Sequence, residues 1–162
     1  MQEVSVVIPN FNGMAYLDGV LSSLERQTIR NFEVILVDNG STDGSCAFVS
    51  AEYPWVHMIQ LPENYGFSRA VNEGIRAARS PYVLLLNNDT EAEPDFLEEM
   101  VAALRRHKKA FSCQAKMIQL HDRDKMDDAG NYYCALGWAF ARGKGKDIRH
   151  YDREQKIFST CA

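Results

Sequence analysis

The sequence predicts an α/β protein with a mainly parallel sheet and flanking helices. Short apolar runs alternate with longer segments in which apolar residues recur with the period of a helix. Three of these runs end abruptly in amides, hydroxyls and carboxylates, and they cover residues 4–8, 32–37 and 82–86. Open parallel sheets bind ligands at the carboxyl ends of their strands. Three polar strand ends therefore predict one polar ligand site, linked to phosphate and a metal ion.

The first 110 residues fit a regular alternation of strands and helices. A strand at residues 4–8 precedes a helix whose apolar face contains Met14, Leu17, Val20, Leu21 and Leu24. A second strand at residues 32–38 leads into a short helix over residues 43–52, and a third strand is expected at residues 56–61.

Two further helices and one strand complete this alternation. One helix is expected to begin near Gly66, with an inner face of Phe67, Ala70, Val71, Gly74, Ile75 and Ala78. The strand at residues 82–87 should be buried on both faces. Pro94 marks the start of the last helix and the basic run at residues 105–109 its solvated end, in agreement with the helix dipole. The inner stripe of this helix is Phe96, Leu97, Met100, Val101 and Leu104.

Residues 110–162 lack this regularity. A strand is expected at residues 111–118 and a charged loop at residues 121–128. Residues 129–149 are rich in glycine and aromatic residues without a helical period, and residues 144–146 predict a mobile loop. A final strand is expected at residues 157–162.

Length and composition indicate one soluble globular domain. A chain of 162 residues can bury roughly 70% of its unfolded surface. Hydrophobic residues make up 46% and charged residues 25%, as in ordinary globular proteins. The net charge of −4 argues against binding to a nucleic-acid backbone. No apolar run approaches the roughly 20 residues that span a bilayer, and residues 1–10 do not resemble a signal peptide.

The four cysteines indicate a reducing compartment. They form no CxxC pair and no close pairing with histidine; they are Cys46, Cys113, Cys134 and Cys161. Unpaired thiols in a reducing cytoplasm are therefore favoured over a zinc site. We expect a cytoplasmic protein, either free or peripheral at the cytoplasmic face of the membrane.

The acid at the end of the strand at residues 82–87 is the first candidate site residue. A carboxylate such as Asp89 is costly to desolvate at a strand end unless it has a partner, and Mg²⁺ or Mn²⁺ is a natural one. Asn87 would point to the same side of an extended chain and could bond a ribose hydroxyl. In the alternative interpretation, Asp89 and Thr90 only cap the helix that starts near Pro94.

Asp38 ends the second strand and is the second candidate. Its carboxylate could accept the N3–H of a uracil or thymine ring, since buried acids are almost never left unpaired. Residues 39–44 have turn composition, and Asp43 is best interpreted as a helix N-cap. A phospho-accepting receiver domain is a rival interpretation, but the first strand ends in Pro9 and Asn10 and supplies no acid.

Arg69 is the third candidate. It falls in the first turn of the helix that opens at Gly66, where it could reach a diphosphate beside the helix N-terminus. A surface role is the alternative for a single arginine. The sequence contains neither GxGxxG nor GxxxxGK[ST], so dinucleotide-binding and P-loop interpretations lose their main support.

Four motifs in order resemble family 2 glycosyltransferases of the GT-A fold, especially the rhamnosyltransferase-like branch. They are residues 6–12, 37–45, 64–67 and 86–89. In that family residues 87–89 correspond to the DxD motif, here with Asn87 in place of its first acid. The resemblance implies that Asp89 binds a divalent metal ion, that Asn87 lies near the ribose, and that Asp38 reads the base.

The resemblance also implies a nucleotide-sugar site with a defined set of residues. These are Pro9, Asn10, Phe11, Asp38, Arg69, Asn87, Asn88 and Asp89. Pro9 and Phe11 would line the base pocket, and Arg69 would contact the diphosphate. The loss of the first acid of DxD predicts a weaker metal site.

The family pattern further implies that residues 1–162 form a C-terminally truncated GT-A domain. Residues 1–110 would be the nucleotide-binding half, and residues 111–162 the start of the acceptor-side half. In the family an acidic motif with the catalytic base follows a strand like the one at residues 157–162. We therefore expect the base beyond Ala162, and little or no sugar transfer by this chain alone.

The predicted function is that of an inverting glycosyltransferase of cell-surface polysaccharide biosynthesis. The donor would be a UDP- or dTDP-sugar, and the acceptor a hydroxyl of a glycan, a lipid or another molecule. One alternative is a nucleotide-binding module without transfer activity. Another is a sugar-1-phosphate nucleotidyltransferase, but residues 9–13 lack its glycine-rich basic signature. Apolar surface near residues 132–140 and 157–162 is expected to be uncovered and to favour a homodimer.

Overall fold

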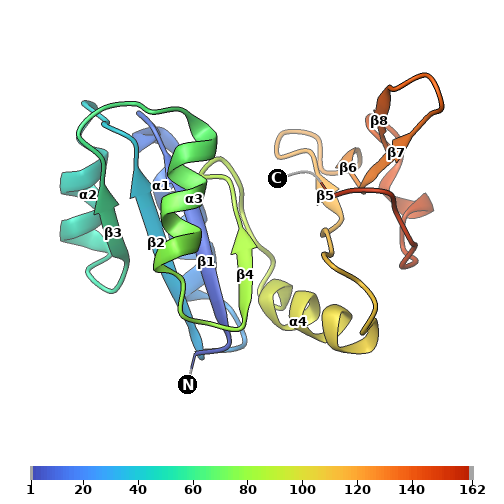
Figure 1. Cartoon of the computed structure of the whole chain (residues 1–162), viewed down its shortest axis with the longest axis horizontal. Helices are drawn as coiled ribbons and strands as arrows, with labels where there is room; N and C mark the ends of the chain where they lie inside the picture. Colours follow the sequence, from blue (N-terminus) through green and yellow to red (C-terminus); the bar gives the residue numbers. More distant parts are fainter. Residues whose placement is uncertain (1, 161–162) are drawn as a thin grey trace. The chain divides into compact units, whose positions relative to one another are not determined.

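The computed structural model describes residues 2–160 of the chain (Figure 1). These residues form two compact units that divide between Glu98 and Glu99, and each unit is described by itself. The division falls some ten residues before the boundary at residue 110 expected from the sequence.

The first unit is built on a parallel sheet of four strands in the order β3-β2-β1-β4. The strands are β1 (Val4–Asn10), β2 (Phe32–Asp38), β3 (His57–Gln60) and β4 (Tyr82–Leu85). Because β1 and β2 are in register from Val4 and Phe32 to Asn10 and Asp38, their polar ends lie side by side. The predicted α/β fold with a parallel sheet is thereby confirmed.

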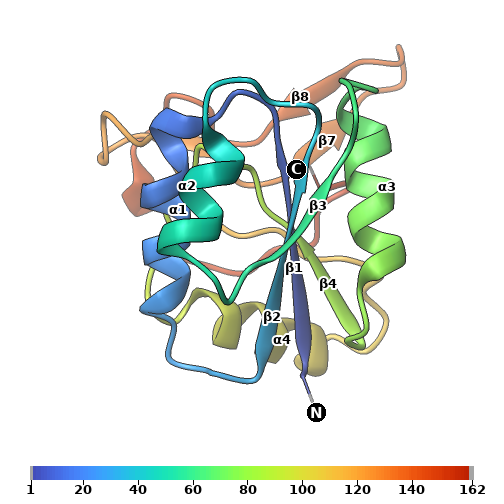
Figure 2. The same ribbon diagram turned by 90° about the vertical axis from the view of Figure 1, so that its left-hand side faces the viewer.

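Helices cover both faces of this sheet. Figure 2 shows α1 (Met14–Glu25) and α2 (Ser45–Glu52) on one face and α3 (Phe67–Ala77) on the other. The predicted apolar stripe of α1 is buried from Leu17 onward, while Met14 is 38% exposed. A fourth helix, α4 (Phe96–Arg106), begins in the first unit and ends in the second.

Helix α3 lies unusually close to the sheet. A Cβ atom on Gly74 would lie 2.2 Å from Cγ1 of Val7, so only glycine fits there. This close approach narrows the buried face of α3 to Ala70, Val71 and Gly74. The prediction that Phe67 and Ile75 belong to the inner face is wrong, because they are 53% and 41% exposed.

Strand β4 is less buried than the sequence predicts. Val83 is 42% exposed, and Tyr82, Leu84 and Leu85 are only partly buried. The physical reason is that, among the described strands, β4 pairs with β1 alone and forms an edge of the sheet. The chain stays extended past Leu85, since the N–H of Leu86 donates to the carbonyl of Val7 at 3.0 Å.

The second unit contains only short strands. They are β5 (Met117–Ile118), β6 (Met126–Asp128), β7 (Asn131–Tyr133) and β8 (Ala139–Ala141), followed by a 3₁₀ turn at Ile148–His150. The expected strand at residues 111–118 thus shrinks to two residues, and the expected charged loop at residues 121–128 ends in a strand. The basic end of α4 is exposed as predicted, and His107 Nε2 contacts Glu154 Oε2 at 2.8 Å.

Turns and single bridges hold the rest of this unit. The loop at residues 144–146 is tied to β6, because the N–H of Met126 donates to the Lys146 carbonyl at 2.8 Å. Instead of a strand at residues 157–162, the chain forms one isolated bridge between Ser159 and Asn131, and residues 161–162 lie outside the described part. Cys46, Cys113 and Cys134 are unpaired thiols, and Cys161 also lies outside that part.

Candidate functional site

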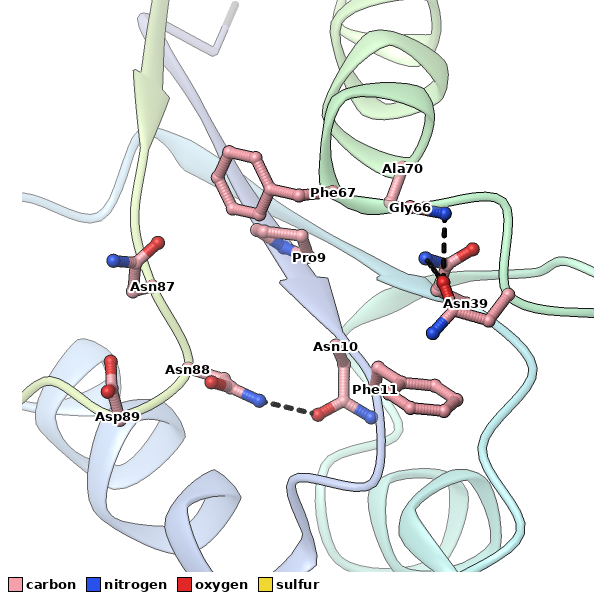
Figure 3. A pocket seen from close by; sticks show the side chains of 11 residues that line it. Pro9, Asn10, Phe11, Asn39, Gly66, Phe67, Ala70, Asn87, Asn88 and Asp89 are labelled. Atoms are coloured by element: carbon pink, nitrogen blue, oxygen red, sulfur yellow. Dashed lines mark hydrogen bonds between the residues drawn. The ribbon is translucent and has the colours of Figure 1, made fainter. Parts of the chain in front are cut away.

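A pocket of about 430 Å³ opens at the carboxyl ends of the parallel strands in the first unit (Figure 3). Its walls come from the end of β1, from the segments that follow β1, β2, β3 and β4, and from the start of α3. The lining residues are Pro9, Asn10, Phe11, Asn39, Asn64, Gly66, Phe67, Ala70, Asn87, Asn88 and Asp89. Six of the eight residues predicted from the sequence therefore line one pocket, whereas Asp38 and Arg69 do not.

Asn10 connects the three polar strand ends. Its side-chain nitrogen donates to Asp38 Oδ1 at 2.9 Å and to Ser41 Oγ at 3.2 Å. Its side-chain oxygen accepts a hydrogen bond from Asn88 Nδ2 at 2.8 Å. With 2% of its surface exposed, Asn10 has used most of its hydrogen-bonding capacity on the protein itself.

Asp38 lies behind the pocket wall and is 2% exposed. Besides Asn10, the backbone N–H of Ser41 donates to its Oδ2 at 2.9 Å. Burial acts to raise the pKa of Asp38, but hydrogen bonds from Ser41, Asn10 and the Cys46 thiol hold that pKa below its usual value. The buried carboxylate is therefore ionised at neutral pH and fully partnered, as expected for a buried acid.

The Cys46 thiol lies against this carboxylate. Burial, and then the hydrogen bond to Asp38 and its charge, raise the pKa of Cys46 to about 11. The thiol therefore stays protonated at neutral pH and acts as a weak donor. A base N–H could reach Asp38 only by replacing one of these donors.

Asn39 and Asn64 fasten the loop before α3 to the end of β2. Asn39 Nδ2 donates to Asn64 Oδ1 at 2.8 Å, and Asn39 Oδ1 accepts from the Tyr65 N–H at 3.0 Å. Gly40 permits this contact, since its φ is +79° and a Cβ there would lie 2.7 Å from Cα of Glu63. Sequence reasoning missed both asparagines as pocket residues, although each stands inside a recognised motif.

The start of α3 supplies an aromatic wall. Gly66 precedes the helix with φ of +84°, and the exposed ring of Phe67 faces the pocket (Figure 3). Arg69 points elsewhere: its Nε lies 2.7 Å from Glu73 Oε1, and its guanidinium is 6.0 Å from the Tyr65 ring centre. The side chain of Arg69 is 60% exposed, as in the surface alternative.

The Asn87–Asp89 segment follows β4 and lines one side of the pocket (Figure 3). Asp89 is exposed, while Asn87 and Asn88 are partly buried. Thr90 Oγ1 donates to the carbonyl of Asn87 at 2.7 Å. These residues are therefore held by their own turn and by Asn10.

A buried glutamine, rather than Asp89 or Thr90, caps the first turn of α4. Gln27 is 1% exposed, and its Oε1 accepts from the N–H of Leu97 at 2.9 Å. Its Nε2 donates to the carbonyl of Glu93 at 2.8 Å. The alternative in which Asp89 and Thr90 serve as helix caps is thus not what the structure displays.

The prediction that Asp43 is a helix N-cap is wrong, because the N-cap of α2 is Gly44, whose φ of +90° suits glycine. Asp43 precedes that position and bonds two helix starts. Its Oδ2 accepts from the Met14 N–H at 2.9 Å and its Oδ1 from the Ser45 N–H at 3.0 Å, so it bonds the first residues of both α1 and α2. The hydrogen bond from the Ser45 hydroxyl is the main cause that lowers the pKa of Asp43. An anion at two helix N-termini is stabilised by both helix dipoles.

The donor atoms in the pocket fit a cation that is shared with a ligand. Asp89 is the one carboxylate among the lining residues, and the amides of Asn87 and Asn88 lie beside it. No group of three or more His, Cys, Asp or Glu residues in the described part of the chain could hold a metal alone. Mg²⁺ and Mn²⁺ accept one or two carboxylates and complete their shell with water and substrate phosphates, so this donor set suits them.

The fold and the site together define an α/β protein with a polar pocket at the strand ends of a parallel sheet. The chain belongs to the family described as "Glycosyl transferase family 2", which matches residues 5–161. The GT-A resemblance seen in the motifs is in agreement with this match.

Individual relatives agree with the family. "Putative glycosyltransferase EpsH" of Bacillus subtilis is 34% identical over 101 residues, which are 60% of this chain and 29% of that protein. "Putative teichuronic acid biosynthesis glycosyltransferase TuaG" of the same organism is 29% identical over 76% of this chain and 50% of its own length. The chain therefore spans half or less of the length of these relatives.

Solved structures show the same fold. S. aureus TarS 1–349 in complex with UDP-GlcNAc superimposes with a TM-score of 0.61 and 27% identity, over 66% of this chain and 32% of that one. The mannosyltransferase PcManGT from Pyrobaculum calidifontis, in complex with GDP-Man and Mn²⁺, superimposes with a TM-score of 0.57 and 25% identity. The match covers 63% of this chain and 32% of that one. None of these four proteins is named a rhamnosyltransferase, so the narrower assignment to that branch lacks support.

None of the helices in residues 2–160 combines the length and the apolar composition needed to cross a membrane.

Proposed function

We propose that this chain is the donor-binding part of an inverting glycosyltransferase that uses a UDP- or dTDP-sugar. The observation that carries the proposal is the pocket of about 430 Å³ in which the end of β1 meets the Asn87–Asp89 segment. A nucleoside diphosphate has the size and polarity for such a pocket.

The relatives support a nucleotide-sugar as the donor. TarS is described in complex with UDP-GlcNAc and PcManGT with GDP-Man and Mn²⁺. TuaG is named for teichuronic acid biosynthesis, which supports a role in cell-surface polysaccharide synthesis. A glycan or a lipid-linked glycan is accordingly the acceptor that we propose.

Each wall of the pocket would have a separate task. The aromatic and proline side chains of Pro9, Phe11 and Phe67 would pack against the nucleoside. Asp89, with the amide oxygens beside it, would hold Mg²⁺ or Mn²⁺, which stabilises charge on the leaving diphosphate when bound. Asn87 would bond the ribose.

Asp38 and Arg69 need local changes to serve as proposed. Asp38 would accept the N3–H of uracil or thymine in exchange for a present donor, and the Cys46 thiol is the weakest of these. Arg69 would leave Glu73 to reach the diphosphate, which its exposed position allows.

Transfer itself needs a base. The acceptor hydroxyl would attack the anomeric carbon as the bond to the diphosphate oxygen breaks, and its proton would pass to a carboxylate. Attack opposite the leaving group inverts the anomeric centre. We assign no described residue to this base.

A nucleotide-binding module without transfer activity is the second candidate. The observation in its favour is that the lining residues include a single carboxylate, Asp89. One carboxylate suffices for binding a metal–diphosphate complex but leaves none for a base once the metal occupies it.

Calorimetric titration with UDP and dTDP, with and without Mn²⁺, tests the proposed function. We expect wild-type protein to bind more tightly with Mn²⁺, and Asp89→Ala to lose that metal dependence. Asp95→Ala, at another exposed acid of the first unit, is the matched control and should bind like wild type. Binding that needs no metal and is unchanged in Asp89→Ala would contradict the role of Asp89.

A further inference from the structure

Three polar side chains, Asp38, Asn10 and Asn88, lie in series, and the last two of them line the pocket. Asp38 accepts from Asn10 at 2.9 Å, and Asn10 accepts from Asn88 at 2.8 Å. Asp38 and Asn10 are each 2% exposed, so water contributes little to their hydrogen bonding. Asn88 stands at the pocket end of the series, next to Asp89.

The direction of these hydrogen bonds follows from chemistry. An ionised carboxylate only accepts hydrogen bonds, so Asn10 must turn its amide nitrogen toward Asp38. The oxygen of Asn10 then faces Asn88, which must present its own nitrogen. The carbonyl oxygen of Asn88 is thereby turned away from Asn10 and toward the Asp89 side of the pocket (Figure 3).

A second contact fixes the same orientation of Asn10. Its nitrogen also donates to Ser41 Oγ at 3.2 Å, and that hydroxyl accepts from the Asn12 N–H at 2.8 Å as well. A rotated Asn10 amide would lose both Asp38 and Ser41 as acceptors. The amide of Asn10 is therefore held in one of its two orientations.

We propose that Asn10 is a positioning residue that orients the Asn88 amide, so that the Asn88 carbonyl oxygen is available to the cation at Asp89. The ionised Asp38 sets the direction of the whole series. The part of this inference that concerns the cation rests on the proposed function. The polarity of the series, meaning the direction in which its hydrogen bonds are donated, does not.

Gly13 fits this arrangement. A Cβ atom there would lie 2.1 Å from Asn88 Nδ2 and 2.3 Å from Asn10 Oδ1, the two atoms of the last hydrogen bond. The backbone of Gly13 has φ of −101° and ψ of 19°, which alanine can also adopt. Glycine is needed at this position for space beside the hydrogen bond, and not for its backbone conformation.

A cycle of two substitutions, followed by thermal unfolding without ligand, tests the polarity. In Asn88→Asp a carboxylate faces the carbonyl oxygen of Asn10, and we expect the melting temperature to fall by about 5 °C. Asp38→Asn should also lower it. In the double variant Asn10 can rotate, donate to the carboxylate at position 88 and accept from the amide at position 38, so the combined loss should be clearly smaller than the two losses together.

A matched cycle supplies the control. Asn87→Asp makes the same chemical change one residue earlier in the same pocket, outside the series. Combined with Asp38→Asn, it should give additive losses. Additive losses in both cycles would overturn the proposed polarity.

Metal affinity tests the orientation of Asn88 and remains measurable if Asp38→Asn does not fold. In Mn²⁺ titrations of the UDP-saturated protein, we expect Asn10→Ala and Asn88→Ala each to weaken Mn²⁺ binding about tenfold, in the range found for partners of metal ligands. Gly13→Ala should do the same without removing any polar atom.

Ser5→Ala is the control for general destabilisation. Ser5 is buried near the other end of β1, where its hydroxyl donates to Glu33 Oε1 at 2.5 Å. This variant should lose stability and keep its Mn²⁺ affinity. Wild-type Mn²⁺ affinity in Asn10→Ala would overturn the positioning role. If wild-type protein bound neither UDP nor Mn²⁺, the proposed function and the cation part would both fail, and the unfolding cycle would still decide the polarity.

Discussion

The two units of the chain are stabilised in different ways. The first unit has a central sheet whose middle strands are mostly buried, with Val6, Val7 and Ile8 at 0% exposure. In the second unit, Met126 is fully buried, while Leu136, Trp138 and Phe158 are 85%, 67% and 71% exposed. Apolar burial thus dominates the first unit, and turns and exposed ion pairs dominate the second.

The difference shows which part can hold a precise site. Every residue that lines the pocket belongs to the first unit, where buried strands fix the positions of the polar side chains. The expectation of uncovered apolar surface near residues 132–140 is confirmed by their exposure, whereas the expected homodimer remains a prediction. The following substitutions test this contrast, in order of decreasing effect.

Truncating one leucine in each unit should produce the largest contrast. Leu21→Ala removes a side chain with 0% exposure, and the cavity should cost about 3 kcal/mol of unfolding free energy. Leu136→Ala acts on a side chain with 85% exposure and should change stability by less than about 0.5 kcal/mol. Urea unfolding measures both; equal losses would contradict the contrast.

Filling the contact between α3 and the sheet should come next. In Gly74→Ala the new methyl group meets Val7, and overpacking of this kind costs about 2 kcal/mol. Gly19→Ala in α1 is the control, because its Cβ would make only an ordinary 3.7 Å contact. That variant should be neutral or gain up to about 1 kcal/mol from helix propensity. Thermal unfolding of the two variants distinguishes sterics from propensity.

Removing the buried cap of α4 should have an intermediate effect. Gln27→Ala leaves the N–H of Leu97 and the carbonyl of Glu93 without their side-chain partner, at a cost of about 1.5 kcal/mol. Gln60→Ala, at an exposed position of β3, should stay within about 0.5 kcal/mol of wild type. Hydrogen exchange at Leu97 gives a local readout, and unchanged protection there would argue against capping.

The pH dependence of stability should separate two carboxylates with lowered pKa values. For Asp38, burial opposes the hydrogen bonds that lower the pKa; for Glu154, the hydrogen bond from His107 is the main cause. When the pKa of a carboxyl group is lower in the folded protein than in the unfolded chain, its ionised form stabilises the fold. This stabilisation is fully present above the unfolded pKa of about 4 and is lost as the pH falls through the folded pKa.

Solvent screening should make the exposed carboxylate the weaker contributor. We therefore expect Asp38→Asn to flatten the loss of stability between pH 5 and pH 3, and Glu154→Gln to change it little. Urea midpoints measured across this range provide the test. An equal flattening by both substitutions would contradict the role of burial.

Much of the first unit could be predicted because its signals are local. Apolar runs and helical periods located the strands and helices of residues 4–106, and the polar strand ends located the pocket. The edge position of β4 could not be read from its apolar run, since it depends on which strands pair. Likewise, the exposure of Phe67 follows from the close packing at Gly74, which no periodicity reports.

The site was predictable in outline and not in its hydrogen bonding. Asn10 and Asn88 were expected as ligand contacts, yet their side chains bond each other. The register of β1 and β2 places Asn10 beside Asp38, so the Asn10 nitrogen faces Asp38 and its oxygen is left for Asn88. In the second unit the strands have only two or three residues, and their positions depend on pairing with segments beyond the next turn. The sequence of residues 111–118 does not show that pairing, so the predicted strand was too long.

The composition of the pocket wall has a consequence for how such chains can diversify. All lining residues fall between Pro9 and Asp89, a single contiguous stretch within the first unit. Substitutions and insertions after α4 therefore replace none of the residues that line the pocket. The two units are free to evolve at different rates, with the ligand chemistry of the pocket inherited as one block.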